Sequence, residues 1–182
     1  MADAQSVPRL DEVHDHGVVT AMTTPPSDQQ LVDFVLREAR LLDQQRWEDW
    51  LDLFAEDGHY WMPVEWGQTD PRLTTSLMYE DKLLLRVRVE RLRGNRTYSQ
   101  SHKSRCHHVL QVPQVDERDD QTLAYSTWTP MHYVESRADE QTLYAAWTTH
   151  HLTVVDGKIK IRLKRVDLVN CDAALGSIQL FL

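Results

Sequence analysis

The residues best suited to chemistry are histidines and cysteines, and several of them are adjacent. The 182-residue chain has nine histidines and two cysteines, with pairs at His107-His108 and His150-His151 and the run Cys106-His107-His108. Adjacent residues on a strand point to opposite faces, so neither histidine pair chelates one metal ion simply. A mononuclear iron site needs two histidines and a carboxylate that converge on an open face. We therefore expect no metal site in this chain.

Cys106 and His108 also form a C-x-H pair, which is half of the ligand set of a Rieske iron–sulfur cluster. The other half, a C-x-x-H pair, is missing, because the only other cysteine, Cys171, is followed by Asp172-Ala173-Ala174. An iron–sulfur cluster needs four ligands. The chain by itself therefore cannot hold one.

General acid–base chemistry is a second candidate, with Asp43, Tyr60 and one of His107 or His108 as the groups that transfer protons. A buried carboxylate beside a histidine and a phenol suits that role. The structural alternative is that Asp43 starts a helix, Tyr60 fills the core and the histidine is a satisfied polar residue. We favour this alternative, because bulky aromatic residues around these positions would fill an interior pocket. The sequence contains no G-x-S-x-G, P-loop or dinucleotide motif.

Length and composition favour one globular domain. The chain is 41% hydrophobic, which excludes wholesale disorder. No apolar run approaches the roughly 18 residues that span a bilayer. The N-terminus lacks a basic start followed by an apolar stretch, so no secretory signal is expected. Two cysteines are too few for a disulfide framework. We expect a cytoplasmic, reduced protein without membrane association.

The net charge of −8 disfavours nucleic-acid binding, which needs clustered Lys and Arg. Basic residues do concentrate between residues 82 and 105. The favoured interpretation is a solvated helix face with partners such as Glu90 at i,i+4 spacing. The alternative is a docking surface for an acidic partner subunit.

The predicted elements that position these residues begin with helices. Residues 1–26 show no apolar period and predict a mobile N-terminal arm, followed by a single domain over residues 27–182. Ser27 and Gln30 form a capping-box pattern, and Pro25-Pro26 blocks extension of the helix backwards. The buried stripe of this first helix consists of Leu31, Val35, Ala39 and Leu42.

Two more helices are expected. Residues 47–54 place their aromatic and leucine side chains on one helical face, and Gly58 would stop that helix before a short strand. Residues 66–73 predict an irregular loop. Residues 76–93 then predict a third helix, with Gly94 at its C-terminus.

After this helix the apolar period changes to two. Strands are predicted over residues 105–115, over residues 123–135 with an interruption at Pro130, and over residues 142–155. Asp156-Gly157 predicts a hairpin turn.

The last strand is predicted to be half exposed and bent. Ile159, Ile161 and Leu163 alternate with basic residues that should face solvent. Arg165 breaks the alternation, which predicts a β-bulge and a bent strand. The basic residues predicted to be exposed are Lys158, Lys160, Arg162 and Lys164.

Together, residues 28–182 resemble the small (beta) subunit of aromatic-ring-hydroxylating dioxygenases. The resemblance rests on an ordered set of segments rather than on one motif. These are Leu41-Leu42-Asp43, Trp47, Trp50-Leu51-Asp52-Leu53-Phe54, Asp57, Tyr60-Trp61-Met62-Pro63, Tyr79-Glu80-Asp81, Leu84, Arg88-Val89-Glu90-Arg91-Leu92, Ser104-Arg105, His107-His108, Ile159 to Leu163, Lys164, Val166, Leu168-Val169-Asn170 and Asp172.

The resemblance implies an α+β, cone-shaped NTF2-like fold, with about three N-terminal helices packed on a curved, mainly antiparallel sheet. It also implies assembly with a large (alpha) subunit and with other beta subunits, commonly three of each type. In that family the alpha subunit carries the Rieske [2Fe-2S] cluster and the mononuclear Fe(II), and NADH supplies electrons through a reductase. The chain itself would then carry no catalytic, cofactor or metal site.

Three functional hypotheses follow. The first is an assembly subunit, whose contact surface we predict at Trp61, Trp66, Arg86, Arg88 and Arg91, together with the N-terminal arm. The second is a stand-alone dehydratase or isomerase that uses Asp43, Tyr60 and His107 or His108. It predicts an open apolar pocket. The third is a non-enzymatic dimeric binding module with an exposed apolar sheet face.

Overall fold

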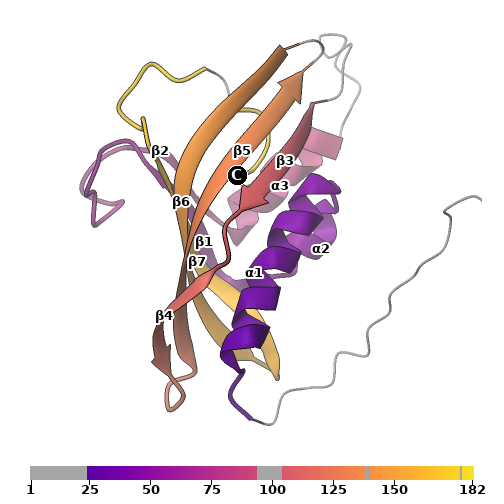
Figure 1. Ribbon diagram of the computed structural model, residues 1–182, viewed down its shortest axis with the longest axis vertical. Coiled ribbons are helices and arrows are strands. Elements are labelled where there is room, and N and C mark those ends of the chain that lie inside the picture. The colour runs from indigo at the N-terminus through magenta and orange to yellow at the C-terminus, as the bar shows by residue number, and fades with distance from the viewer. Residues whose placement is uncertain (1–23, 94–103, 138–139, 177) are drawn as a thin grey trace, which may run out of the picture.

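The computed structural model describes residues 24–93, 104–137, 140–176 and 178–182. Helices α1 (Asp28–Asp43), α2 (Trp47–Leu51) and α3 (Lys82–Arg93) accompany one curved sheet, and α1 crosses a face of it that we call the inner face (Figure 1). The strands are β1 (Phe54–Pro63), β2 (Ser76–Asp81), β3 (Arg105–Leu110), β4 (Gln114–Asp119), β5 (Ala124–Arg137), β6 (Glu140–Val155) and β7 (Lys158–Leu168). The predicted arm lies almost wholly outside the described residues.

Over the described ranges the sheet has seven strands in the order β2-β1-β7-β6-β5-β3, with β4 also paired with β5. Neighbouring strands in the described residues pair antiparallel, except for the parallel pair β1–β7. Strands β5 and β6 pair from Ala124↔Thr153 to Arg137↔Glu140 and form the long centre of the sheet. The predicted α+β architecture with a curved, mainly antiparallel sheet is confirmed.

Helix α1 begins as the sequence predicts. The backbone N–H of Ser27 donates to Oε1 of Gln30 at 2.8 Å, and the N–H of Gln30 donates to the Ser27 hydroxyl at 3.3 Å. This reciprocal pair is a complete capping box. The predicted stripe is buried against the sheet, with Leu31 and Leu42 fully covered.

The second predicted helix is too long. Helix α2 ends at Leu51, and both Phe54 and Gly58 belong to β1. A Cβ atom at position 58 would lie 2.6 Å from the carbonyl oxygen of Ile161 and 2.9 Å from that of Ala55. Gly58 therefore allows β1 to approach β7 closely, instead of ending a helix. A short apolar run at this spacing is compatible with either element, which explains the error.

The third predicted helix is wrong in its first six residues, which form strand β2. Helix α3 begins at Lys82, where the carboxylate of Asp81 accepts the backbone N–H of Leu84 at 2.8 Å. Such an aspartate is a standard helix-capping group. Leu85 and Val89 form the buried side of α3, while Gly94 lies outside the described residues.

The strand predicted over residues 105–115 is two strands, β3 and β4, separated by residues 111–113. Pro130 does not interrupt β5. It lies opposite the gap between β3 and β4, where the N–H of Gln111 donates to its carbonyl oxygen at 3.0 Å. Proline has no N–H to donate, so a break in one neighbouring ladder accommodates it.

The predicted bulge in the last strand is present at Arg162, not at Arg165. The pairing steps from His151↔Leu163 to Leu152↔Ile161 and leaves Arg162 without a partner in this register. The slip turns Lys164 to the inner face, where it is 1% exposed, so its predicted exposure is wrong. The predicted Asp156-Gly157 turn is confirmed, since both residues have positive φ angles, 50° and 70°.

The core lies between the inner face of the sheet and the helices. Its largest fully buried aromatic side chains are Trp50, Tyr60, Tyr133, Phe54 and Phe181. Among the helices in the described ranges, none has the length and apolar character to cross a membrane.

Candidate functional site

The C-terminal segment, residues 178–182, enters the interior of the domain; we call it the tail. Its residue Phe181 is fully buried. The Phe181 ring centroid lies 4.3 Å from that of Trp50, 5.8 Å from that of Tyr60 and 6.1 Å from that of Trp47. The chain therefore fills this aromatic part of its own interior.

Tyr60 holds the end of the tail by two hydrogen bonds. Its hydroxyl donates to the carbonyl oxygen of Leu182 at 3.0 Å and accepts the backbone N–H of the same residue at 3.2 Å. Burial, followed by the nearby Glu38 carboxylate, raises the pKa of Tyr60. The hydroxyl therefore stays protonated, and the two hydrogen bonds described above tie it to the tail.

Glu135 holds the start of the tail. Its carboxylate accepts the backbone N–H groups of Gln179 at 3.2 Å and Leu180 at 3.3 Å. The hydroxyl of Tyr133 donates to the same carboxylate at 2.9 Å. Burial is the main cause that raises the pKa of Tyr133, so this hydroxyl also remains a donor.

Asp43 meets both histidines that were predicted to work with it. It is the last residue of α1, not the start of the second helix. Its Oδ1 accepts the backbone N–H of His108 at 3.0 Å and lies 2.6 Å from Nδ1 of that ring, while its Oδ2 lies 3.2 Å from Nδ1 of His107. The structure thus brings together Asp43, His107 and His108, whereas Tyr60 bonds to the tail instead.

The two histidines differ in exposure as alternation along β3 requires. The side chain of His107 is 69% exposed and that of His108 is 1% exposed. Beside them, Sγ of Cys106 donates to the carbonyl oxygen of Leu42 at 3.6 Å. Burial, followed by the charge of Asp43, raises the pKa of the Cys106 thiol to about 12. A carboxylate oxygen of Asp43, Sγ of Cys106 and a ring nitrogen of His108 all lie within 4.8 Å of one another.

Two surface cavities lie elsewhere. One, of about 400 Å³, is lined by residues of α2 together with Arg93, Ser104 and Leu180. The other, of about 410 Å³, is lined by residues around Glu135 and Tyr144. Neither lining includes the three predicted acid–base positions, Asp43, Tyr60 and His107 or His108. These two cavities therefore do not join the predicted acid–base residues.

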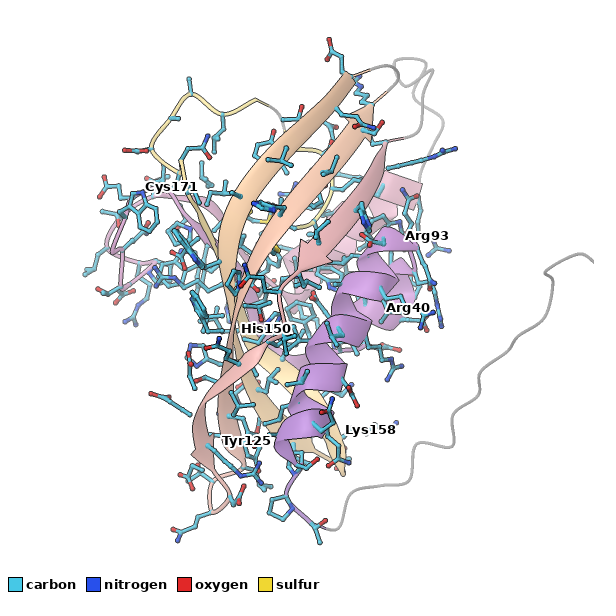
Figure 2. All side chains as sticks on the ribbon, viewed as in Figure 1. Arg40, Arg93, Tyr125, His150, Lys158 and Cys171 are labelled. Atoms are coloured by element: carbon cyan, nitrogen blue, oxygen red, sulfur yellow. The ribbon has the colours of Figure 1, made fainter. Side chains whose placement is uncertain are left out.

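A buried ionic cluster, which sequence reasoning missed, ties α1 to the sheet. The Glu38 carboxylate accepts from Lys164 Nζ at 2.6 Å and from Trp50 Nε1 at 2.7 Å, and its other oxygen lies 3.6 Å from Nε2 of His150. Figure 2 shows His150 between the strands and α1. The available signal was the position of Glu38 on the apolar stripe of α1, three residues after Val35.

The charges within this cluster compensate for one another. Burial would raise the pKa of Glu38, but Lys164 and His150 outweigh burial and hold that pKa far below its usual range. Burial lowers the pKa of Lys164 and of His150, against the attraction of Glu38. Because Glu38 of α1 is paired with Lys164 of β7 and lies beside His150 of β6, the cluster joins α1 to these two strands.

The predicted contact residues occupy different environments. Trp61 is 3% exposed, lies beneath the guanidinium of Arg165 at 4.3 Å from its ring centroid, and donates to the Ser76 hydroxyl at 2.9 Å. Trp66 is 54% exposed and packs edge-on against Trp147. Any contribution of Trp61 to an interface would be to position its neighbours.

The three predicted arginines lie on α3. Arg88 is half buried and its Nε donates to Glu80 at 3.0 Å, so its charge already has a partner within the chain. Arg86 and Arg91 are exposed. The interface role of all five predicted residues remains a prediction.

An apolar patch accompanies these arginines. Leu83, Leu84 and Val87 of α3 are 64%, 50% and 43% exposed, on the helix whose opposite side buries Leu85 and Val89. We call Leu83, Leu84 and Val87 the α3 patch. Helix α3 therefore carries apolar side chains on its outer side as well as on its inner side. A surface helix whose outer side faces water is normally polar there.

The elements and interior define an α+β domain of the NTF2-like type, whose inner sheet face is covered by helices and whose interior takes up its own tail. The family model described as "Ring hydroxylating beta subunit" matches residues 37–173. The chain belongs to this family of ring-hydroxylating beta subunits.

Curated relatives agree with this assignment. The 2-halobenzoate 1,2-dioxygenase small subunit of Burkholderia cepacia is 34% identical over 110 residues, which cover 57% of this chain and 66% of that protein. The benzoate 1,2-dioxygenase subunit beta of Acinetobacter baylyi is 33% identical over 106 residues, 55% of this chain and 62% of that protein. The matched region thus spans just under two thirds of the length of these relatives.

Solved structures share the fold. The beta subunit of the benzoate 1,2-dioxygenase from Burkholderia mallei has a TM-score of 0.68 at 24% identity, over 85% of this chain and 97% of that one. A protein described as a scytalone dehydratase, from Novosphingobium aromaticivorans, has a TM-score of 0.57 at 12% identity, over 78% of this chain and 83% of that one. The same fold therefore occurs in proteins described as dioxygenase subunits and as a dehydratase.

Proposed function

We propose that this chain is the assembly subunit of a multicomponent dioxygenase that adds dioxygen to an aromatic ring. The observation that carries the proposal is the tail, because Phe181 occupies the aromatic interior that an enzyme of this fold would need for a substrate. The relatives support the same role, since their names describe small or beta subunits of aromatic dioxygenases.

In this proposal a separate alpha subunit carries the Rieske [2Fe-2S] cluster and the mononuclear Fe(II), and NADH supplies electrons through a reductase. The residues of this chain do not fit a Rieske cluster, which takes two cysteines and two histidines. Within the described ranges, one group of three or more ligand-type side chains comes together, and it contains a single cysteine, Cys106.

The stand-alone dehydratase or isomerase is the weaker alternative. It requires Asp43, Tyr60 and His107 or His108 to face one open pocket. Tyr60 is instead bonded to Leu182 at the end of the tail. Asp43 is bonded to β3 through His108.

We propose that the α3 patch and the flanking Arg86 and Arg91 contact a neighbouring subunit. Apolar side chains exposed together on one helix mark an interaction surface more often than isolated ones. The two exposed guanidinium groups would select an acidic counterpart. The stoichiometry proposed for the complex is three alpha and three beta subunits.

The first experiment is to co-express the chain with the alpha subunit of its own system and to measure native mass and bound iron together. We expect one complex that contains both chains and the absorption of a Rieske cluster. An iron-free homo-oligomer that leaves the alpha subunit behind would overturn the proposal.

A charge-reversal pair tests the surface. In the Arg86→Glu/Arg91→Glu variant we expect the complex to dissociate at a higher protein concentration than the unsubstituted complex, because repulsion replaces the proposed attraction to an acidic counterpart. The matched control is Arg37→Glu, since Arg37 is an exposed arginine on α1. Equal loss of assembly in both variants would remove the α3 surface from the proposal.

A further inference from the structure

The C-x-H pair of β3 is a motif that the assembly role leaves unexplained. Cys106 and His108 are two residues apart on one strand, so their side chains point to the same face. That face is directed at the end of α1, because Sγ of Cys106 reaches the carbonyl oxygen of Leu42 and His108 reaches Asp43. Strand alternation thus aligns a sulfur and an imidazole beside a carboxylate.

The three groups already lie close to a metal-binding arrangement. Their ligand atoms are all within 4.8 Å of one another. Ligands at about 2.0–2.3 Å from one tetrahedral zinc ion lie roughly 3.3–3.8 Å apart. A shift of about 1 Å in the side chains would therefore suffice for three of the four positions around an ion.

Against the expectation from the sequence that the chain holds no metal site, we propose that Asp43, Cys106 and His108 form a binding site for a single zinc-class divalent ion. A thiolate and an imidazole favour Zn²⁺ or Co²⁺ over Mg²⁺ and Ca²⁺, which prefer oxygen ligands only. The thiolate and the carboxylate balance the two positive charges of the ion. On binding, the Cys106 thiol releases its proton to solvent and the sulfur forms a bond to the metal.

The fourth position of such a site would be open to water. Asp43 and Cys106 are only partly buried, so a water molecule can complete the coordination. Three protein ligands and an open position are typical of zinc sites that are not purely structural. The site does not depend on the proposed assembly role, because the three side chains come from one chain.

A hydrogen-bonded tie between α1 and β3 is the competing interpretation, and it predicts no affinity for metal. Cobalt(II) distinguishes the two, since a thiolate bound to cobalt gives a charge-transfer absorption band. The full-length chain, freed of metal by a chelator, is titrated with Co²⁺ and then with Zn²⁺. We expect one cobalt per chain, a sulfur-to-cobalt band, and loss of the band as zinc displaces cobalt.

Cys106→Ser should abolish the band and lower cobalt affinity by at least about 100-fold, because it removes a ligand rather than a supporting group. Cys171→Ser is the matched control and should keep the band. Cys171 is buried, whereas Cys106 is partly buried, and Figure 2 shows Cys171 well away from Arg40, which lies near the end of α1. His107→Ala should also keep the sulfur band.

Circular dichroism checks that each variant is folded, and Cys106→Ala is the second variant should Cys106→Ser fail to fold. The proposal is overturned if the folded chain binds no cobalt or if the band survives in both Cys106 variants. It is equally overturned if Cys171→Ser removes the band, since the metal would then be bound elsewhere.

Discussion

The interior and the outer side of α3 both contain apolar and charged groups, but they differ in whether these groups have partners. In the interior, Glu38 is bonded to Lys164, and Phe181 is surrounded by aromatic rings. On α3, Leu83 and Leu84 are at least half exposed. The comparison teaches that the chain itself supplies the partners of Glu38 and Phe181, whereas the outer side of α3 leaves apolar surface for another chain to cover.

The largest effect is expected from Lys164→Met. The variant leaves the Glu38 carboxylate buried without its cation, and such a loss costs about 3–5 kcal/mol of unfolding free energy. Urea unfolding measures it. The control Lys158→Met, at an exposed position of the same strand, should change stability by less than about 0.5 kcal/mol.

The double variant Glu38→Gln/Lys164→Met sharpens this test. It removes both charges and keeps a side-chain oxygen for Trp50 Nε1, so most of the lost stability should return. If the double variant is as unstable as the single one, Lys164 stabilises the interior by packing and not by charge.

Tyr60→Phe tests the bonds that hold the tail. It leaves the buried carbonyl and N–H groups of Leu182 without partners, at a cost of about 1–3 kcal/mol. Tyr79→Phe is the control, because Tyr79 is 41% exposed, and its effect should stay within about 0.5 kcal/mol. Thermal unfolding measures the stability of the two variants. Equal effects would show that the hydrogen bonds of Tyr60 to the tail contribute little to stability.

Sequence patterns predicted those features whose causes are local. Ser27 and Gln30 are three residues apart, and Asp156-Gly157 needs only its own backbone, so both were predicted correctly. The end of the second helix was assigned wrongly beyond Leu51, because a short apolar run suits a helix or a strand, and the close approach of Gly58 to Ile161 decides between them.

The candidate site shows the same division. Asp43, His107 and His108 were grouped by their chemistry, and the fold does bring them together. The partner of Tyr60 is 122 residues away, so no local pattern could indicate it. The pair Glu38–Lys164 depends on the bulge at Arg162, which turns Lys164 inward. Side-chain alternation predicted this bulge at Arg165, three residues too late, so the pair was missed.

His150 should make stability depend on pH. Burial is the largest cause that lowers its pKa, and Lys164 and His151 act in the same direction while Glu38 opposes them. The unfolded chain binds a proton below about pH 6.5 and the folded chain does not, so stability falls as pH falls below that value, by at most about 1.4 kcal/mol per pH unit.

Unfolding of His150→Gln between pH 7 and pH 5 should therefore show a shallower slope than that of the unsubstituted chain. The matched control is His151→Gln, at the exposed neighbouring position, which should change the slope far less, because His151 is the smallest of the named causes that shift the pKa of His150. A slope that is the same in all three proteins would mean that other groups carry the pH dependence.

The smallest effect on the chain itself is expected from Leu84→Glu in the α3 patch, although its effect on assembly should be large. Leu84 is 50% exposed, so the unfolding free energy of the isolated chain should change by less than about 0.5 kcal/mol. A charge placed in the apolar centre of an interface costs about 2 kcal/mol or more. Leu36→Glu on α1, where Leu36 is 43% exposed, is the matched control. Sedimentation of each variant with the alpha subunit should show dissociation for Leu84→Glu alone. If the two variants behave equally, the exposed leucines of α3 do not form an interface any more than Leu36 of α1 does.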